Sequence, residues 1–382
     1  MIYQKGVFFF IVFALINVIA VSQLPVEGDP YIKFDNLITK NGLSSNYILD
    51  IYQDSEGYIW VATRNGLNRF DGYDFTTYKN NPGDPSSISS NLVTSIAEDK
   101  LNNLWFGTNR GLNKFDRQKS SFVNYKSTAH DTSIFINENV RAILCDTLNI
   151  LWIENAKGKL RKINPNGEVT VYKHKAPSMV NTYFYHSIVQ NQNQLWIGGR
   201  YMGLIRFDTK KEVFYQVMTD PNDATKKRDE DVGAYFIDSQ GVFWVGGTDG
   251  LYTFDKDAEI FSKKLTVSTF SIDEDRNQDL YFGTGGGLYI LDRKLNKFKR
   301  CIHDDNNASS LINDHINKVF IDRSGNIWIG TIDGLSVIRS SKNKFAHICH
   351  IPGNNSTPSS NHVTTILQDN RERIWYGTEG GG

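Results

Sequence analysis

A twelve-residue segment that recurs eight times constrains the fold of this chain more than any other feature. Its clearest copy is LWFGTNRGLNKF, from Leu104 to Phe115. All seven tryptophans of the protein occupy one position of this segment, which we call the anchor, and a tyrosine fills it in one further copy. The anchors are Trp60, Trp105, Trp152, Trp196, Trp244, Tyr281, Trp328 and Trp375.

Two other residue types recur at fixed distances from the anchor. An aspartate stands six residues before seven of the eight anchors, and Gln190 replaces it in the fourth copy. A glycine stands six residues after the anchor, displaced by one residue to Gly203 in the fourth copy. Six of the eight residues three before the anchor are Gly or Asn, which tolerate a left-handed turn. We expect the aspartate to accept hydrogen bonds from the free amides of that turn.

Each copy, with its flanks, is typical of four short antiparallel strands. An apolar segment precedes the aspartate, the anchor segment is aromatic and β-branched, and two further short strands follow the glycine. Successive anchors lie 45, 47, 44, 48, 37, 47 and 47 residues apart, by subtraction of their numbers. Four-stranded propeller blades repeat at about 40–50 residues, and the segments lack the apolar spacing of a helical solenoid. The sequence therefore predicts an all-β protein, a β-propeller of four-stranded antiparallel blades.

The segment Tyr31 to Ile38 resembles a fourth strand that has no blade of its own. Pairing of this strand with the last blade would close the ring and hide both open sheet edges. Residues 31–340 are then predicted to form a seven-bladed propeller. Residues 341–382 would begin a second, truncated propeller, because they repeat the same strand order and stop before a third strand. A single eight-bladed ring is the alternative.

Residues 1–22 are predicted to be a secretory signal peptide. Lys5 supplies the positive charge, an apolar stretch of sixteen residues follows, and Ala20-Val21-Ser22 provides a small-x-small cleavage site. A retained membrane anchor is the alternative, although the stretch is short for a spanning helix of about 20 residues. The 42 basic and 42 acidic residues balance, so the overall charge gives no indication of binding to nucleic acid or an acidic membrane.

The unit GLSSNYILDIYQDSEGYIWVATRNGLNRFDGYDFTTY resembles the two-component-regulator propeller repeat, and the resemblance extends over residues 31–382. It implies the N-terminal fragment of the periplasmic sensor region of a Bacteroidetes hybrid two-component system. Such proteins carry a signal sequence, two seven-bladed propellers, a small β-sandwich, a membrane helix and kinase, receiver and DNA-binding modules. The resemblance implies sensing of oligosaccharides that induces glycan-utilisation genes, and dimerisation of the full-length protein. It implies no enzyme activity, nucleic-acid contact or membrane contact within these residues.

Motifs that carry metal or catalytic chemistry are weak in this chain. The segment from Asp273 to Asp279 spaces carboxylates as a calcium loop does, but it lacks the required Gly and Glu and coincides with a strand turn. The HICH segment, from His347 to His350, lacks a second pair of zinc ligands. No helix follows Gly285–Gly287 to receive a phosphate. We therefore expect no metal, cofactor or catalytic residue. The odd number of cysteines gives no basis for a disulfide, and Cys145 is expected to be a buried hydrophobe.

The loops between second and third strands hold the candidate ligand-binding residues. Basic residues occupy this loop in blades one to four, and aspartates occupy it in blades five and seven. An aromatic loop before the fourth blade adds rings suited to stacking on sugars. The candidates are Arg64, Arg110, Lys157, Arg200, Tyr201, Tyr183, Tyr185, Asp249 and Asp333. Either they form a polarised face that binds a carboxylated or sulfated sugar, or they are solvated loop residues.

Two functions from different classes agree with these observations. The first is a periplasmic ligand-sensing domain that binds an oligosaccharide. The second is a secreted propeller enzyme, a lyase or glycosidase acting on polysaccharide, which would need two carboxylates about 5–9.5 Å apart. In most copies a glycine stands two residues after the anchor, whereas the third copy has Glu154 at that position. The uniform blades favour the binding function.

Overall fold

The protein is described by a computed structural model of its 382 residues. The structure describes residues 26–27, 32–125, 138–155, 158–174, 187–199, 203–217, 232–258, 260–340, 350, 357–371 and 373–380. The predicted signal peptide lies outside these residues. Within them the chain is almost entirely β-structure, and its one helical element is the 3-10 turn η1 (Thr39–Asn41). The described part contains no helix long and apolar enough to cross a membrane.

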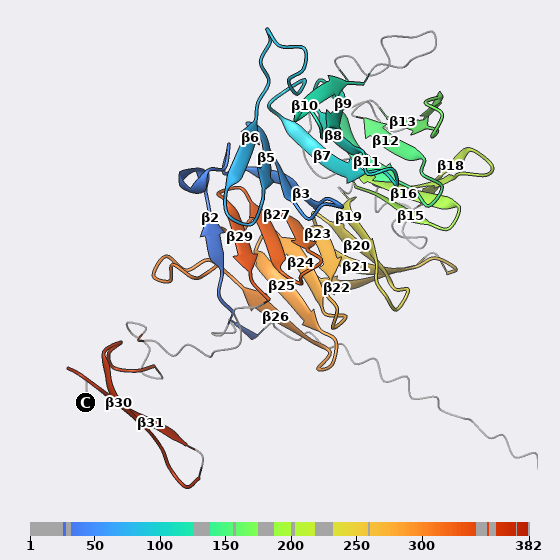
Figure 1. Ribbon diagram of the computed structural model, residues 1–382. Helices are drawn as coiled ribbons and strands as arrows, with labels where there is room; N and C mark the ends of the chain where they lie inside the picture. Colours follow the sequence, from blue (N-terminus) through green and yellow to red (C-terminus); the bar gives the residue numbers. More distant parts are fainter. Residues whose placement is uncertain are drawn as a thin grey trace, which may run out of the picture.

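Four-stranded antiparallel sheets follow one another along the chain, as Figure 1 shows. Blade one contains β3 (Ile48–Gln53), β4 (Ile59–Thr63), β5 (Gly66–Phe70) and β6 (Phe75–Tyr78). Blade two contains β7 (Val93–Glu98), β8 (Leu104–Thr108), β9 (Gly111–Asp116) and β10 (Ser121–Asn124). Blade three contains β11 (Val140–Cys145), β12 (Leu151–Asn155), β13 (Lys159–Ile163) and β14 (Val169–Lys173).

The next three sheets repeat this order. Blade four contains β15 (Ser187–Asn191), β16 (Gln194–Gly199), β17 (Gly203–Asp208) and β18 (Val213–Val217). Blade five contains β19 (Val232–Ile237), β20 (Phe243–Gly247), β21 (Gly250–Asp255) and β22 (Ile260–Leu265). Blade six contains β23 (Thr269–Glu274), β24 (Leu280–Thr284), β25 (Gly287–Asp292) and β26 (Lys297–Cys301). A short strand that the sequence did not indicate, β1 (Val26–Glu27), pairs in parallel with the edge of β26.

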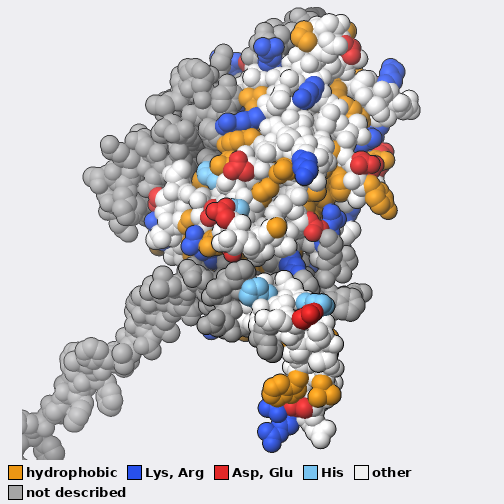
Figure 2. Space-filling view, turned by 90° about the vertical axis from the view of Figure 1, so that its left-hand side faces the viewer, with side chains coloured by type: hydrophobic (Ala, Val, Ile, Leu, Met, Phe, Trp, Pro, Cys, Tyr) orange, Lys and Arg blue, Asp and Glu red, His pale blue; other side chains and the backbone are white. Residues whose placement is uncertain are grey.

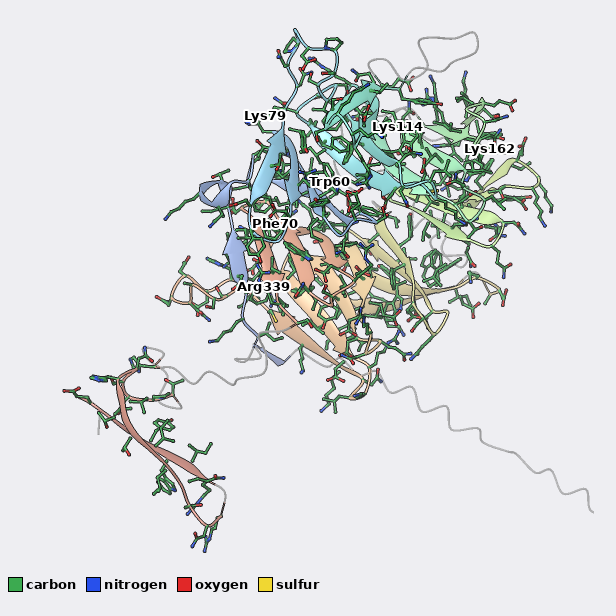
Figure 3. All side chains as sticks on the ribbon, in the orientation of Figure 1. Trp60, Phe70, Lys79, Lys114, Lys162 and Arg339 are labelled. Atoms are coloured by element: carbon green, nitrogen blue, oxygen red, sulfur yellow. The ribbon has the colours of Figure 1, made fainter. Side chains whose placement is uncertain are left out.

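Blade seven joins the two ends of the ring. It contains β27 (Ile316–Ile321), β28 (Ile327–Thr331) and β29 (Leu335–Ile338), and its fourth strand is β2 (Asp35–Leu37). Arg339 reinforces the closure through an ion pair with Asp35 at 2.8 Å, and Figure 3 labels Arg339 beside β2. The predicted seven-bladed propeller is confirmed, and the eight-bladed alternative is wrong because the N-terminal strand already completes the seventh sheet.

The residues after the ring form a separate two-stranded sheet of β30 (Val363–Gln368) and β31 (Ile374–Thr378). Its repeat residues are exposed: the anchor Trp375 is 55% exposed, and Ile366 and Leu367 are exposed beside it. Figure 2 shows apolar side chains on the surface of this hairpin, in the lower part of the view. Its identity as the start of a second propeller stays a prediction.

The hydrophobic core is divided into seven layers, one at each junction between consecutive blades. Each layer contains an anchor ring from one blade and apolar side chains from the next. Trp60 of blade one, for example, lies 5.1 Å from the rings of both Phe106 and Phe115 in blade two. All seven anchors within the ring are buried. Such close aromatic pairs add to the free energy gained by burial alone.

The repeated aspartate joins the turn between first and second strands to the anchor. In blade one, Asp54 Oδ1 accepts the backbone N–H of Tyr58 at 3.0 Å, as the sequence predicted. Its Oδ2 accepts the indole N–H of Trp60 at 2.8 Å, a contact that the sequence analysis missed. The same indole bond recurs at Trp105, Trp152, Trp244, Trp328 and Trp375. One carboxylate therefore satisfies both the turn and a buried donor.

Blade four departs from this pattern because its turn is one residue shorter. Gln190 pairs with Leu195, the residue before the anchor, just as Gln53 pairs with Ile59 in blade one. Asn191 therefore occupies the position that the aspartate has in the other blades. Counting six residues back from the anchor assigns Gln190 to that position, but Gln190 is the residue directly before it in the strand order. The indole N–H of Trp196 is buried without an acceptor among the described residues. A buried donor without a partner typically costs about 1–3 kcal/mol.

Lengthening this turn should stabilise the ring. We expect replacement of residues 191–194 by the sequence Asp-Arg-Ser-Gly-Asn of the turn in blade seven to raise the unfolding free energy by about 1 kcal/mol, because the new aspartate accepts the Trp196 indole N–H. Urea denaturation measures the gain. The matched control carries Asn at the first position of the same graft. Equal stability of the two grafts would show that the carboxylate has no such role.

Closure by β2 generates a second prediction. Deletion of residues 32–38 exposes the edge of β29 and removes the Asp35–Arg339 ion pair, so we expect a large fall in melting temperature. A chain that ends at Arg339 should melt like the full chain, because β30 and β31 lie in a separate sheet. Calorimetric melting compares the two. Equal losses from both truncations would contradict closure by β2.

Candidate ligand-binding site

A β-bulge recurs in the innermost strand of six blades of the ring. The register between first and second strands shifts by one residue, for example between Val93 and Ser95 of blade two, which leaves Thr94 unpaired. A bulge bends the strand and redirects a side chain, and bulges are frequent next to functional sites. The bulged residues are Leu49, Thr94, Arg141, Gly233, Phe270 and Asn317.

All six bulged residues line one cavity at the centre of the ring. The cavity has a volume of about 240 Å³, and residues of all seven innermost strands contribute to its wall. The bulge recurs at the same place in six blades, whereas the bulged residues are in turn apolar, hydroxyl, cationic, a glycine, aromatic and amide. The ring thus presents a varied set of contacts from a uniform scaffold, as a binding site requires.

The bulged side chains also contact neighbouring blades. Thr94 donates its hydroxyl to the carbonyl of Val140 at 2.6 Å, and Asn317 donates its amide to the carbonyl of Ile48 at 2.8 Å. The ring of Phe270 stacks on His315 of blade seven, with 5.2 Å between centroids. These contacts hold the side chains in defined positions around the cavity.

Two charged residues of the cavity wall, Lys318 and Asp50, form an ion pair between blades seven and one, and Asp273 of blade six interacts with Lys318. Lys318 lies 2.8 Å from Asp50, whose other oxygen accepts the N–H of Ile96 at 2.9 Å. Burial opposes the charge of Lys318, but the carboxylates of Asp50 and Asp273 raise its pKa. Desolvation raises the pKa of the partly buried Asp273 to about 6. None of these three residues was singled out as a ligand contact by the sequence analysis.

Unpartnered polar atoms also belong to the cavity wall. The hydroxyl of Ser95 and the side-chain oxygen of Asn139 have no hydrogen-bond partner in the part of the chain that the structure describes. Buried polar atoms normally have a partner, so such atoms indicate positions where water or a polar ligand binds. The cavity is therefore suited to a small polar molecule.

Two predicted basic residues lie at the end of the ring where the bulges occur. Arg64 and Arg110 are exposed in the hairpins between second and third strands, next to the segments that enter β3 and β7. The guanidinium of Arg64 stacks over the ring of Tyr47 at 3.6 Å. This stacking orders one cation at the rim, and the predicted basic half of the face stays a prediction.

The predicted acidic half is partly neutralised. Asp249 accepts a hydrogen bond from Tyr252 and forms an ion pair with Lys263 at 3.3 Å. Asp333 accepts the amide of Asn313 at 2.6 Å. The remaining candidates, Lys157, Arg200, Tyr201, Tyr183 and Tyr185, lie outside the described residues, and their roles stay predictions.

Glu154 lies inside the ring wall and is only 1% exposed. Most blades have glycine there because the next blade approaches closely: a Cβ on Gly107 would lie 2.7 Å from Val140. Glu154 belongs to blade three, whereas the candidate carboxylates Asp249 and Asp333 belong to the hairpins of blades five and seven. Blade three also contains a cluster of charged side chains. In this cluster Glu138 forms an ion pair with Arg161 and a second one, at 3.1 Å, with Lys159.

The weak motifs of the sequence prove structural where they are described. Asp275 Oδ1 accepts the N–H groups of Asn277 and Asp279 in the turn before β24, which confirms the predicted turn. The Nδ1–H of His350 donates to the carbonyl of Pro358 at 2.7 Å, and the rest of HICH lies outside the described residues. The described residues contain no group of three or more metal-binding side chains.

Cys145 is only half-buried, which corrects the expectation of full burial.

The raised pKa of Asp273 generates a pH prediction. Because the folded-state pKa of about 6 exceeds the ordinary value of 3.8, its contribution to stability is present below pH 3.8 and is lost as pH rises through about 6. In the unmodified chain, the unfolding free energy should fall by up to about 3 kcal/mol between pH 3.8 and about 6 because of this residue. We expect Asp273→Asn to abolish this part of the pH dependence. Denaturant titrations between these pH values test this. The control is Asp74→Asn at an exposed site, and equal pH dependence of both variants would contradict the prediction.

Comparison with known proteins agrees with this architecture. The sequence profile of the two-component regulator propeller matches residues 42–65, 87–110, 310–333 and 357–380. A histidine kinase P4 of Formosa agariphila is 40% identical over 83 residues, which are 22% of this chain and 6% of that protein. The chain therefore spans a small fraction of this relative.

Solved structures extend the likeness to the whole ring. The extracellular domain of the putative hybrid two-component system BT3049 from B. thetaiotaomicron is 27% identical, with a TM-score of 0.76 over 92% of this chain and 47% of that one. A streptogramin B lyase shares the fold at 13% identity, with a TM-score of 0.59 over 80% of this chain and 96% of that one. Four of the eight copies of the repeat thus match the two-component regulator propeller repeat, and the ring is similar to the extracellular domain of a putative hybrid two-component system.

Proposed function

We propose that this propeller is the extracellular ligand-sensing part of a two-component signalling protein, and that its ligand is an oligosaccharide. The observation that supports this proposal best is the repeated bulge, which places chemically different side chains around one central cavity. Hydroxyl, amide, cationic and aromatic groups next to one another suit a sugar, whose ring offers hydroxyls at its edge and an apolar face.

The rim of the cavity suggests the chemical class of the sugar. Arg64 and Arg110 are exposed in adjacent blades, and Arg141 lines the cavity below them. A guanidinium binds carboxylate or sulfate with two parallel hydrogen bonds. An acidic oligosaccharide is therefore the preferred ligand, with an uncharged one as the alternative that stacking on Tyr183, Tyr185 or Tyr201 would favour.

The signalling step belongs to the remainder of the protein. Kinase activity, dimerisation, anchoring in the inner membrane and control of glycan-utilisation genes are proposals for the full-length protein, and the periplasm is the proposed location of this part. An enzyme of propeller architecture is the competing function. Its support is limited, because the likeness to lyases at 13% identity extends to the fold alone.

Calorimetry with sulfated and uncharged oligosaccharide fragments tests the proposal. We expect Arg110→Ala to weaken binding of the acidic fragment at least about tenfold, with a dependence on salt, because exposed charges are screened over about 8 Å at physiological ionic strength. Arg141→Gln should weaken the binding of either class. The control is Lys119→Ala, which removes a cation that is 78% exposed in the turn between β9 and β10, at the opposite end of the ring.

Unchanged affinity in both Arg110→Ala and Arg141→Gln would contradict the proposed site. Cleavage of any fragment by the unmodified propeller would support the enzyme instead, and chromatography of the same titration samples detects it. Binding without cleavage agrees with the sensing function.

A further inference from the structure

A second cavity lies between blades four and five, at the end of the ring opposite the bulges. Its volume is about 410 Å³. It is bordered by the shortened turn of blade four, by the end of β17 with the turn that follows it, and by the turn after β21. The side chains of Arg206, Lys210, Lys211 and Lys256 supply four positive charges, against two negative charges from Asp208 and Asp257.

Two other blade junctions fill the corresponding place with an internal ion pair. Asp54 of blade one accepts the indole N–H of Trp60 and also pairs with Arg117 of blade two at 3.0 Å. Asp238 of blade five likewise accepts its anchor indole and pairs with Arg293 of blade six. Both arginines directly follow the third strand of their blade. The pattern is one carboxylate held by an indole donor and by a cation from the next blade.

The junction between blades four and five has the donors of this pattern without the carboxylate. Lys256 directly follows β21, so it occupies the same place as Arg117 and Arg293. The indole N–H of Trp196, in a side chain only 1% exposed, has no acceptor among the described residues. Asn191 replaces the aspartate, and the turn is one residue shorter, which leaves the cavity open.

The acidic residues of the cavity do not replace the missing carboxylate. Asp208 accepts the backbone N–H groups of Lys211 and Lys210 in its own turn, and these hydrogen bonds lower its pKa. The Nε of Arg206 is buried without a partner in the described part of the chain. No ion pair of the described residues involves Lys210, Lys211 or Lys256. The cavity therefore keeps an excess of unpaired positive charge.

We infer that this cavity binds the carboxylate of a small ligand, which takes the place of the absent aspartate between Lys256 and the shortened turn. The carboxylate would accept the Trp196 indole N–H and balance the charge of Lys256, as Asp54 does for Trp60 and Arg117. A volume of about 410 Å³ leaves room for a body the size of a sugar acid beyond the carboxylate. This site is independent of the central cavity proposed above, because it lies at the other end of the ring.

Nuclear magnetic resonance of the indole N–H groups tests the inference with the full chain. Sodium glucuronate is the probe, and methyl glucoside is the uncharged control at equal ionic strength. The Trp196→Phe variant identifies the Trp196 signal. We expect glucuronate to shift this signal in a saturable manner and methyl glucoside to leave it unchanged.

Two single substitutions locate the carboxylate. Lys256→Gln removes the cation, and Asn191→Asp adds a fixed negative charge at the wall of the cavity, so each should raise the Kd for glucuronate at least about tenfold. Lys119→Gln, in the matching turn of blade two, should leave the Kd unchanged. The inference is overturned if glucuronate does not shift the Trp196 signal, or if both cavity variants bind glucuronate like the unmodified chain.

Discussion

The hydrogen bond between the repeated aspartate and the anchor indole is the interaction on which this ring depends. Each blade junction is stabilised by burial of one large aromatic ring against the next sheet, and an indole can be fully buried at low cost only if its N–H has an acceptor. Asp54, Asp99, Asp146, Asp238 and Asp322 supply that acceptor with one carboxylate oxygen. The other oxygen fixes the turn that brings the strand back, so local turn geometry and packing between sheets are joined in one residue.

This arrangement separates stability from recognition along each blade. The aspartate and anchor contacts lie at one end of the sheet and in its middle, whereas the bulge lies at the other end of the innermost strand. A bulged residue is outside the regular pairing, so its identity can change without loss of a ladder hydrogen bond. Leu49, Thr94, Arg141 and Phe270 accordingly differ in chemistry at equivalent bulges. Variation at one position of a uniform repeat thus produces an asymmetric cavity in a symmetric ring.

The sequence predicted the parts of the structure that depend on local chemistry. Gly57, Asn102 and Asn149 adopt the expected left-handed conformation, with φ of 100°, 62° and 61°. Seven blades and closure by the N-terminal strand also followed from the repeat. The bulge was not predictable, because it is a relation between two strands and leaves no signature in either alone. The neutralisation of Asp249 by Lys263 was missed for the same reason, since strand pairing brings together residues fourteen positions apart.

Blade four shows how a closed ring accommodates a local defect. Its shortened turn preserves the pairing of β15 with β16 and the bond from Thr147 N–H to Gln190, which corresponds to the bond from Arg323 N–H to Gln53. What it loses is the carboxylate that joins the turn to the indole in five other blades and that, in blades one and five, also pairs with an arginine of the next blade. The neighbouring junctions hold blades four and five in place, so the defect remains as a cavity with unpaired donors. A ligand carboxylate bound there would complete this junction, and because it binds only the closed ring, its binding free energy would add directly to the stability of the ring.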